Sequence, residues 1–383
     1  MRLEPSEEQV LLKDMLGRLL QDRYGFEQRR QYGREPAGFS DGIWAAYAEL
    51  GLLGIGFSEE EGGIGGGAAE VMIVAERLGA HLTLEPWIET VVTAGSFLRR
   101  GGSAGQCAAR IPAIVAGGHR MSFAQAERQS RYTLHDVTTT ATRVADGWLL
   151  DGEKIHVVNA DSAGEFIVTA RISGNRRDRD GIAVFMVGAD TPGVGISPYA
   201  TVDGRRAGIV RFGGVAVSDA DRLGEAGEAL PLVEAAVDET LAAQAAEALG
   251  SMQAALDMTV EYVKARTQFG RPIGSFQVVQ HRASEMLAAA EQARSMVLLS
   301  AMMARCEARD DRRRAISAAK VELCRAARFI GEQAVQLHGG IGLTMEYAVG
   351  HHLKHLKALE VAYGDGDHHL QALVELGGPF AGE

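Results

Sequence analysis

A short segment in the C-terminal third groups side chains that could bind a phosphorylated, planar molecule. It reads RTQFGRPIGSFQ over residues 266–277 and gathers two arginines, two phenylalanines and two glutamines at a break between two helical patterns. Guanidinium groups bind phosphate esters through paired hydrogen bonds, and aromatic rings stack on planar or cationic groups. An ordinary interhelical turn with solvated arginines would contain the same residue types. The segment by itself therefore leaves both interpretations open.

A second segment, QLHGGIGLTMEY over residues 336–347, places two glycines directly after a helical pattern. Glycine lacks a β-carbon, so Gly339 and Gly340 would let the backbone approach a bound molecule closely. A glycine pair in this position also forms the usual C-cap and turn of a helix. Taken alone, the segment is best interpreted as a helix C-cap and turn. Its position after RTQFG in the sequence favours a binding role shared by the two segments.

Carboxylates and imidazoles gather near the C-terminus, where Asp365, Asp367, His368 and His369 lie within five residues. These residue types are metal ligands, but adjacent histidines rarely converge on one ion without a supporting scaffold. Three further histidines lie on a preceding helical pattern that we expect to be polar and exposed: His351, His352 and His355. We therefore expect no metal site.

Three patterns along the chain predict the elements that position these segments. Residues 1–120 are helical in pattern, and Ser6 is a plausible N-cap before leucines at helical spacing. Residues 121–230 change to short alternating or β-branched runs separated by turn dipeptides, and residues 231–383 return to long helical patterns. No βαβ alternation occurs. We predict an α+β multidomain fold, with an N-terminal helical domain, a middle antiparallel β-barrel or sandwich and a C-terminal four-helix bundle.

Composition excludes several classes of protein. With 383 residues, 46% hydrophobic and 23% charged residues, the chain is long enough for more than one hydrophobic core. A net charge of -11 argues against nucleic acid, and three cysteines argue against a disulfide framework or a zinc site. The N-terminus is charged and no long apolar run occurs, so we expect no membrane insertion and a cytoplasmic location.

The two segments resemble the signatures of the acyl-CoA dehydrogenase family. RTQFGRPIGSFQ fills every fixed position of R-x-Q-F-G-x-P-I-x-x-F-Q, and QLHGGIGLTMEY resembles Q-x-x-G-G-x-G-[YF]-x-x-E. The resemblance implies a flavoprotein that binds FAD and acyl-CoA, forms a dimer of dimers, and passes electrons to an electron-transferring flavoprotein. It also implies that six residues reach the FAD of a neighbouring subunit: Arg266, Phe269, Gln277, Gln336, Gly339 and Gly340.

The middle segment resembles the part of the family that binds the flavin of its own chain. The resemblance assigns flavin contacts there to Phe123, Gln125, Ala126, His156 and Val158. Here the sequence departs from the family, because alanine and valine replace two flavin-binding threonines at positions 126 and 158. His156 replaces a stacking tryptophan. An isolated histidine on a strand is usually structural, although an imidazole can also stack on a flavin ring.

The family's reaction needs a carboxylate that removes the α-proton of the thioester while hydride leaves the β-carbon. Counting from the family's turn near the C-terminus places Tyr363 at the usual glutamate position, and the alternative position on the first helix of the C-terminal domain holds Thr240. A phenol is a poor base at neutral pH. Asp365 would reach the substrate after a one-residue shift of the turn, and further acids lie nearby: Asp367, Glu360 and Glu239.

Three functions remain open from the sequence. The first is FAD-dependent α,β-dehydrogenation of an acyl-CoA thioester, with Asp365 as a candidate base. The second is a non-catalytic subunit in a heterotetramer, similar to the small-subunit type of paired acyl-CoA dehydrogenases, which completes the FAD site of a base-bearing partner. The third is a flavin-free acyl-CoA-binding or scaffold protein.

Overall fold

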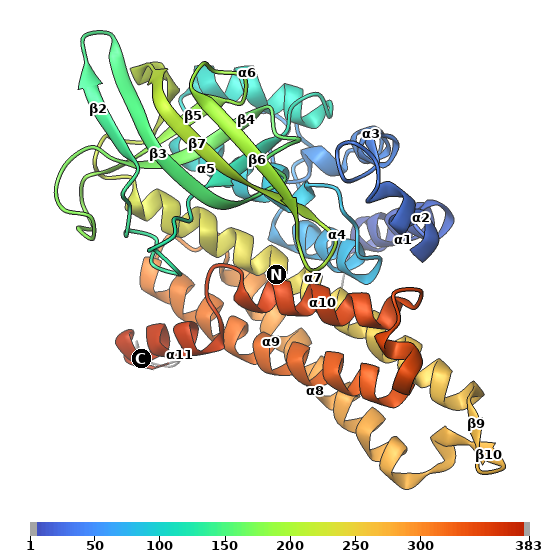
Figure 1. Cartoon of the computed structure of the whole chain (residues 1–383). Helices are drawn as coiled ribbons and strands as arrows, with labels where there is room; N and C mark the ends of the chain where they lie inside the picture. Colours follow the sequence, from blue (N-terminus) through green and yellow to red (C-terminus); the bar gives the residue numbers. More distant parts are fainter. Residues whose placement is uncertain (1–5, 379–383) are drawn as a thin grey trace. The chain divides into compact units, whose positions relative to one another are not determined.

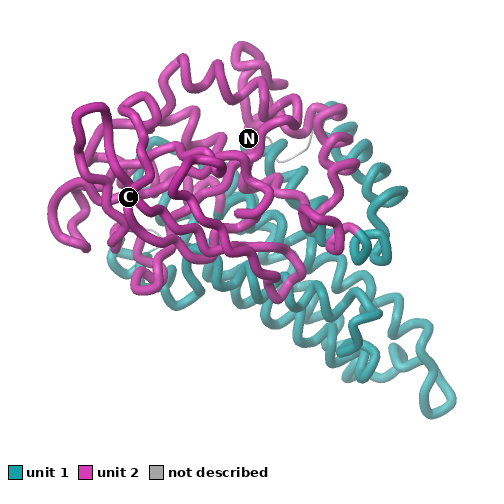
Figure 2. The backbone as a smooth tube through the Cα atoms, turned by 45° about the horizontal axis from the view of Figure 1, so that its top comes forward, with its two compact units in different colours: residues 1–31, 68–83, 241–383 teal, residues 32–67, 84–240 magenta. Residues whose placement is uncertain are grey.

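The computed structural model describes residues 6–378, which divide into two compact units (Figure 2). The helical unit comprises the described parts of 1–31, 68–83 and 241–383, and the sheet unit comprises 32–67 and 84–240. The N-terminal and C-terminal segments of the sequence thus both contribute to the helical unit. The three-domain division remains an interpretation of the sequence, since these units follow packing rather than chain order.

The helical unit is built around a bundle in which α8 and α9 lie side by side and α10 and α11 pack on α9 (Figure 1). Ser6 and Gln9 form a capping box at the start of α1, which confirms Ser6 as an N-cap. The unit contains the helices α1 (Glu7–Arg23), most of α2 (Phe26–Tyr32), α4 (Ala68–Ala80), α7 (Leu230–Ala265) from Leu241 onward, α8 (Gln277–Met303), α9 (Arg309–His338), α10 (Ala348–Val361) and α11 (Gly366–Glu375).

Helices α4 and α7 cross at two glycines. A β-carbon on Gly79 would overlap the backbone of Glu247, and a β-carbon on Gly250 would overlap the backbone of Glu76. Only glycine allows two helix backbones to approach this closely. The crossing fixes an N-terminal helix against the first helix of the bundle.

The sheet unit carries eight strands in the order β6-β7-β3-β2-β4-β5-β8, with β1 paired to β4. Its core includes Phe166, Phe185 and Phe212, all buried. The strands are β1 (Met121–Ala124), β2 (Thr140–Val144), β3 (Gly147–Val158), β4 (Glu165–Arg171), β5 (Ile182–Gly188), β6 (Val194–Ala200), β7 (Arg206–Val217) and β8 (Arg222–Leu223). Helices precede them: α3 (Asp41–Glu49), η1 (Leu52–Gly54), the π-helix η2 (Ile88–Ala94), α5 (Gly95–Gly101) and α6 (Ala104–Val115).

The predicted fold class is confirmed, with one refinement in the sheet. Most neighbouring strands are antiparallel, but β1 runs parallel to β4, and β2 joins β4 by one parallel pair. Alternating patterns within strands do not encode the direction of a neighbour that is distant in sequence, so the sequence could not show this pairing. Among the described helices, none is long and apolar enough to cross a membrane.

Candidate active site

The first signature segment forms an exposed hairpin between α7 and α8 (Figure 1). Its short strands β9 (Thr267–Gln268) and β10 (Arg271–Pro272) are joined by Phe269 and Gly270, with φ angles of 51° and 77°. Two positive φ angles are typical of a tight hairpin turn. The turn directs Phe269 outward, and the residue is 91% exposed.

The other residues of this segment are also accessible. Arg266 and Gln277 are exposed, and the guanidinium of Arg271 lies over the ring of Phe276 at 4.1 Å. The cation-π contact orients the side chain of Arg271 against the segment that leads into α8. The hairpin thus presents a ring, a guanidinium and an amide to solvent, the groups that suit an adenine ring and a pyrophosphate.

A stack of three rings brings the second signature segment to the same end of the bundle. His338 stacks on Tyr262, at the end of α7, with 4.4 Å between ring centroids, and contacts Tyr347 at 5.0 Å. Burial lowers the pKa of His338, so the ring packs as a neutral aromatic group. Gln336, Gly339 and Gly340, around this buried ring, are exposed.

Gly339 and Gly340 differ in whether the backbone conformation requires glycine. Gly339 has a φ of 63° and ends α9, so the C-cap interpretation accounts for it. Gly340 has no positive φ, and a β-carbon there would meet no described atom within 4 Å. The described fold therefore gives no reason for glycine at position 340, whereas close approach of a ligand from outside the chain would.

The sheet unit brings together the expected own-chain flavin positions but offers few polar groups there. Phe123 and Gln125 are buried, and Phe123 packs against Phe97 at 4.8 Å. The carbonyl of Ala126 accepts a hydrogen bond from the N–H of Ile155. The carbonyl of Val158 accepts one from a serine hydroxyl at 2.8 Å. Positions 126 and 158 carry no hydroxyl that could bond a flavin ring. The sheet unit therefore fits the flavin ring of FAD less well than the exposed hairpin fits the adenine and pyrophosphate of FAD.

His156 interrupts β3 with a φ of 53°, beside a register shift against β7. The residue is exposed, and its Nδ1 lies 3.1 Å from the hydroxyl of Tyr199. A non-glycine residue in the left-handed region is uncommon and stores backbone strain. The position keeps an accessible ring where the family has tryptophan.

Neither position of the family's base carries a carboxylate. Thr240 is buried, and its hydroxyl makes hydrogen bonds of 2.8 Å with the hydroxyl of Thr93 and the carbonyl of Ala236. Tyr363 follows α10 with a φ of 52°, and Gly364 has a φ of 122°. A threonine bonded on both sides cannot remove a carbon-bound proton, and a phenol is a weak base.

The nearby acids have other partners. The carboxylate of Glu239 accepts hydrogen bonds from Ser96 (2.8 Å), Arg100 (2.9 Å) and Arg99 (2.7 Å). Glu360 is paired with Arg328 and with Lys357. Both carboxylates are thus held in ion pairs with arginine or lysine side chains.

The two aspartates of α11 serve its N-terminus. Asp365 is the N-cap, because its carboxylate accepts a hydrogen bond from the backbone N–H of His368. Asp367 is exposed in the first helical turn. The structure thus gives Asp365 a role in the fold rather than a free carboxylate aimed at a substrate.

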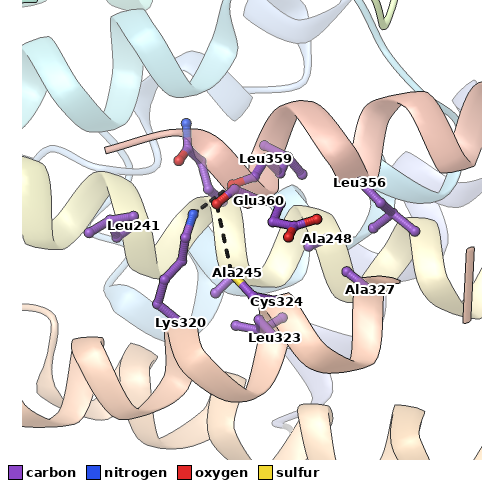
Figure 3. Close-up of a pocket in the computed structure, with 11 residues that line it drawn as sticks. Leu241, Ala245, Ala248, Lys320, Leu323, Cys324, Ala327, Leu356, Leu359 and Glu360 are labelled. Atoms are coloured by element: carbon purple, nitrogen blue, oxygen red, sulfur yellow. Dashed lines mark hydrogen bonds between the residues drawn. The ribbon is translucent and has the colours of Figure 1, made fainter. Parts of the chain in front are cut away.

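Side chains that the sequence analysis did not select hold the turn around Tyr363. The buried ammonium of Lys320, on α9, donates to the carbonyl of Leu359 (2.6 Å), and Cys324 lies 3.7 Å from the carbonyl of Glu360 (Figure 3). The same ammonium donates to the carbonyl of Ala362 at 3.0 Å. Burial lowers the pKa of Lys320 to about 8. In the sequence, Lys320 is marked only by its apolar neighbours Ala319 and Val321 in the pattern AAKVELC.

His369 completes this support from α11. It is fully buried, and burial lowers its pKa to about 2, so the imidazole is neutral. Its Nε2 lies 3.3 Å from the carbonyl of Tyr363 and its Nδ1 lies 3.1 Å from the hydroxyl of Ser317. Nε2–H therefore donates to the carbonyl while Nδ1 accepts from the hydroxyl.

The cavity beside Lys320 is too small for a substrate. It has a volume of about 20 Å³ and lies between α7, α9 and α10 (Figure 3). A single water molecule needs roughly 10–15 Å³ on this scale. Because Lys320 donates to two carbonyls at the end of α10 and borders no space for a substrate, it acts as a buried cap for that helix.

The expectation of polar, exposed histidines on α10 is wrong. His351, His352 and His355 are all buried. His352 lies 2.8 Å from the hydroxyl of Ser251, and His355 lies 3.4 Å from the carboxylate of Glu247. His352 and His355 face α7, whereas His351 packs its ring against Phe26 at 4.8 Å, because packing selects the buried face of α10. Within residues 6–378, no group of three or more histidine, cysteine or acidic side chains is arranged to hold a metal.

Comparisons with known proteins agree with these features. Sequence models of the acyl-CoA dehydrogenase N-terminal, middle and C-terminal domains match residues 6–118, 122–215 and 227–375. A probable acyl-CoA dehydrogenase of Bacillus subtilis, YngJ, is 30% identical over 334 residues, covering 85% of this chain and 86% of the relative. The acyl-CoA dehydrogenase FadE12 of Mycobacterium tuberculosis is 28% identical over 352 residues, covering 91% and 89%.

Solved structures share the fold along nearly the whole chain. The ChsE4-ChsE5 complex from Mycobacterium tuberculosis has a TM-score of 0.87 at 25% identity, covering 98% of both chains. The Tcur3481-Tcur3483 steroid acyl-CoA dehydrogenase variant has a TM-score of 0.86 at 27% identity, covering 97% of both. With all three domain models matched in order, this chain belongs to the acyl-CoA dehydrogenase family, the FAD-dependent oxidoreductases that dehydrogenate acyl-CoA thioesters.

Proposed function

We propose that this chain is the base-free subunit of a heteromeric acyl-CoA dehydrogenase and completes the FAD site of a base-bearing partner. The observation that carries the proposal is a contrast within the chain. Thr240 and Tyr363 occupy the two base positions, while the signature residues that would contact a neighbour's cofactor are present and exposed.

In this proposal the exposed end of the helical unit binds the nucleotide part of FAD. Arg266 would pair with the pyrophosphate and Phe269 would stack on the adenine side. Gln277 and Gln336 would supply amide hydrogen bonds, and Gly340 would allow the backbone to approach. FAD, when bound, accepts the hydride from the acyl β-carbon. The residues of this chain bind and orient the cofactor and exchange no proton with the substrate.

Two similar solved structures support a paired assembly. The ChsE4-ChsE5 complex and the Tcur3481-Tcur3483 enzyme are each named for two components, and both structures are at least 25% identical to this chain. We propose a cytoplasmic dimer of dimers that acts in fatty acid or lipid degradation, with acyl-CoA as substrate and an electron-transferring flavoprotein as acceptor.

Flavin content tests the proposal directly. The full chain is purified alone and after co-expression with a candidate partner that carries the glutamate, and flavin absorbance is measured per chain. We expect a colourless chain alone and a yellow complex that bleaches when acyl-CoA is added without oxygen. A chain that binds stoichiometric FAD and bleaches alone would overturn the proposal in favour of a self-sufficient dehydrogenase.

A matched pair of variants separates cofactor binding from assembly. Arg266→Gln should reduce the FAD content of the co-purified complex, whereas Arg282→Gln, an exposed arginine within α8, should leave it unchanged. Size-exclusion chromatography shows whether the complex still forms. A complex with full FAD content in Arg266→Gln would contradict the assigned role. Absence of flavin under every condition would favour the scaffold interpretation.

A further inference from the structure

The helical unit contains a second, larger cavity of about 420 Å³. It is lined by the turn between α1 and α2, the C-terminal half of α4, and facing stretches of α7 and α10. None of its lining residues belongs to the two signature segments or to the turn at Tyr363. Small-molecule sites occupy about 300–1,000 Å³, so the cavity is large enough for a ligand.

The glycine crossing of α4 and α7 forms one wall and keeps the cavity open. Gly250 lines the cavity, and Gly79 and Gly250 already bring the two backbones into contact. Helices in backbone contact cannot move closer to fill the neighbouring space. The crossing therefore prevents α4 and α7 from closing the cavity by moving together.

Most polar groups around the cavity satisfy one another. Arg294 pairs with Glu76 at 3.1 Å and donates to the amide oxygen of Gln253 at 3.3 Å. The amide nitrogen of Gln253 donates to Asp257 at 2.9 Å. These contacts leave the acids Glu76 and Asp257 beside the cavity with partners of their own.

Arg77 is different, because its Nε atom is buried and has no hydrogen-bond partner within the described residues. Arginine keeps its proton at all physiological pH values, so this N–H remains a donor that needs an acceptor. A buried donor without an acceptor is costly and uncommon. The natural acceptor for a guanidinium is a carboxylate or a phosphate.

The remaining walls decide between these acceptors. Tyr24, Phe26 and Met258 supply an apolar surface, which suits a ligand with a hydrocarbon or aromatic body. Glu76 is neutralised by Arg294, so Asp257 is the acid in the wall that would repel a second negative charge, which disfavours phosphate esters and dicarboxylates. One cation, one acid without a cationic partner in these contacts and an apolar wall together select a single negative charge on an apolar body.

We propose that this cavity is a binding site for a small monocarboxylate, whose carboxylate pairs with Arg77 and whose apolar body lies against Tyr24, Phe26 and Met258. The site uses no flavin position and does not depend on the proposed subunit role. It lies within the helical unit and would bind a free organic acid there.

Isothermal titration calorimetry on the purified full chain tests the site without any cofactor. The probes are benzoate and hexanoate, with benzyl alcohol, 1-hexanol and inorganic phosphate as controls for the charge and the apolar body. We expect one carboxylate per chain and at least about tenfold weaker binding of the alcohols and phosphate. Absence of carboxylate binding, or equal binding of the alcohols or phosphate, would overturn the proposal.

Three variants locate the binding. Arg77→Met removes the guanidinium, Ala254→Leu fills the cavity, and Arg18→Met alters an exposed arginine on α1 as a matched control. Each of the first two should weaken benzoate binding about tenfold or more, and the third should not change it. If Arg77→Met does not fold by circular dichroism, Ala254→Leu decides. Unchanged affinity in a folded Arg77→Met or Ala254→Leu variant would contradict the site.

Discussion

The carboxylate of Asp365 lies 3.0 Å from the backbone N–H of His368 and accepts its hydrogen bond, which caps α11 directly after the turn at Tyr363. The sequence offered Asp365 as the one acid that a small shift could bring to a substrate. A capping carboxylate is held at the helix N-terminus by its geometry. A substitution at Asp365 therefore tests both its candidate role as the base and its contribution to the stability of α11.

Asparagine at position 365 should preserve the fold and the function of the assembly. Asparagine caps helices about as well as aspartate, whereas alanine loses the cap and costs about 1 kcal/mol of unfolding free energy. Urea unfolding of Asp365→Asn and Asp365→Ala measures this difference. Acyl-CoA-dependent bleaching of the complex should survive in Asp365→Asn. Loss of bleaching in that variant, with stability intact, would identify Asp365 as the base.

Gly340→Ala should separate cofactor binding from folding. No described atom lies within 4 Å of the added β-carbon and the φ angle is not positive, so chain stability should change by less than about 0.5 kcal/mol. The FAD content of the complex should fall, since the methyl group occupies the space for the ligand. Gly105→Ala, at an equally open position in α6, is the control that should keep full FAD content.

Gly339→Ala should instead destabilise the chain itself. Its φ of 63° lies in the left-handed region, where a β-carbon costs about 1–2 kcal/mol. Thermal unfolding of the isolated chain would show a lower midpoint for Gly339→Ala than for Gly340→Ala. Equal midpoints would mean that the turn at the end of α9 relaxes without cost.

Removing one partner of the buried ion pair in the sheet unit should be severe. The ammonium of Lys154 lies 2.7 Å from the carboxylate of Glu127, and both side chains are almost fully buried. Glu127→Gln leaves the charge of Lys154 uncompensated and should cost about 3–5 kcal/mol. Glu261→Gln breaks an exposed pair with Lys264 and should cost at most about 1 kcal/mol. Urea unfolding compares the two, and a small effect at Glu127 would show that water reaches Lys154.

Acid should destabilise the sheet unit through two carboxylates. Burial would raise the pKa of Glu127, but the charge and hydrogen bond of Lys154 outweigh burial and lower it from 4.5 to about 2. At Glu165, burial likewise raises the pKa, but the hydrogen bonds and charges of Arg110 and His119 outweigh burial and lower the pKa to about 2. Folded pKa values below the unfolded value contribute stability that is present above pH 4.5 and lost as the pH falls toward 2.

Unfolding free energies measured between pH 6 and pH 2.5 test this dependence. The slope against pH below 4.5 should be shallower in Glu165→Gln than in the unchanged chain, because glutamine does not titrate. Identical slopes would show that Glu165 titrates alike in the folded and unfolded states.

The sequence by itself determined the family and the missing base. RTQFGRPIGSFQ and QLHGGIG are continuous segments, and the helical and strand periods are local patterns, so both can be read without knowing the fold. The identities of Tyr363 and Thr240 follow from counting along the chain. These features depend on the order of residues alone.

Only the tertiary structure decided how the remaining charges are used. Glu239 meets Arg99 and Arg100, which precede it by about 140 residues, and Lys320 reaches the end of α10 from α9. The buried histidines of α10 and the open space around Gly340 likewise depend on which helix faces pack together. Sequence patterns encode local periods. Whether a carboxylate is free, capping or paired is settled by neighbours that are distant along the chain.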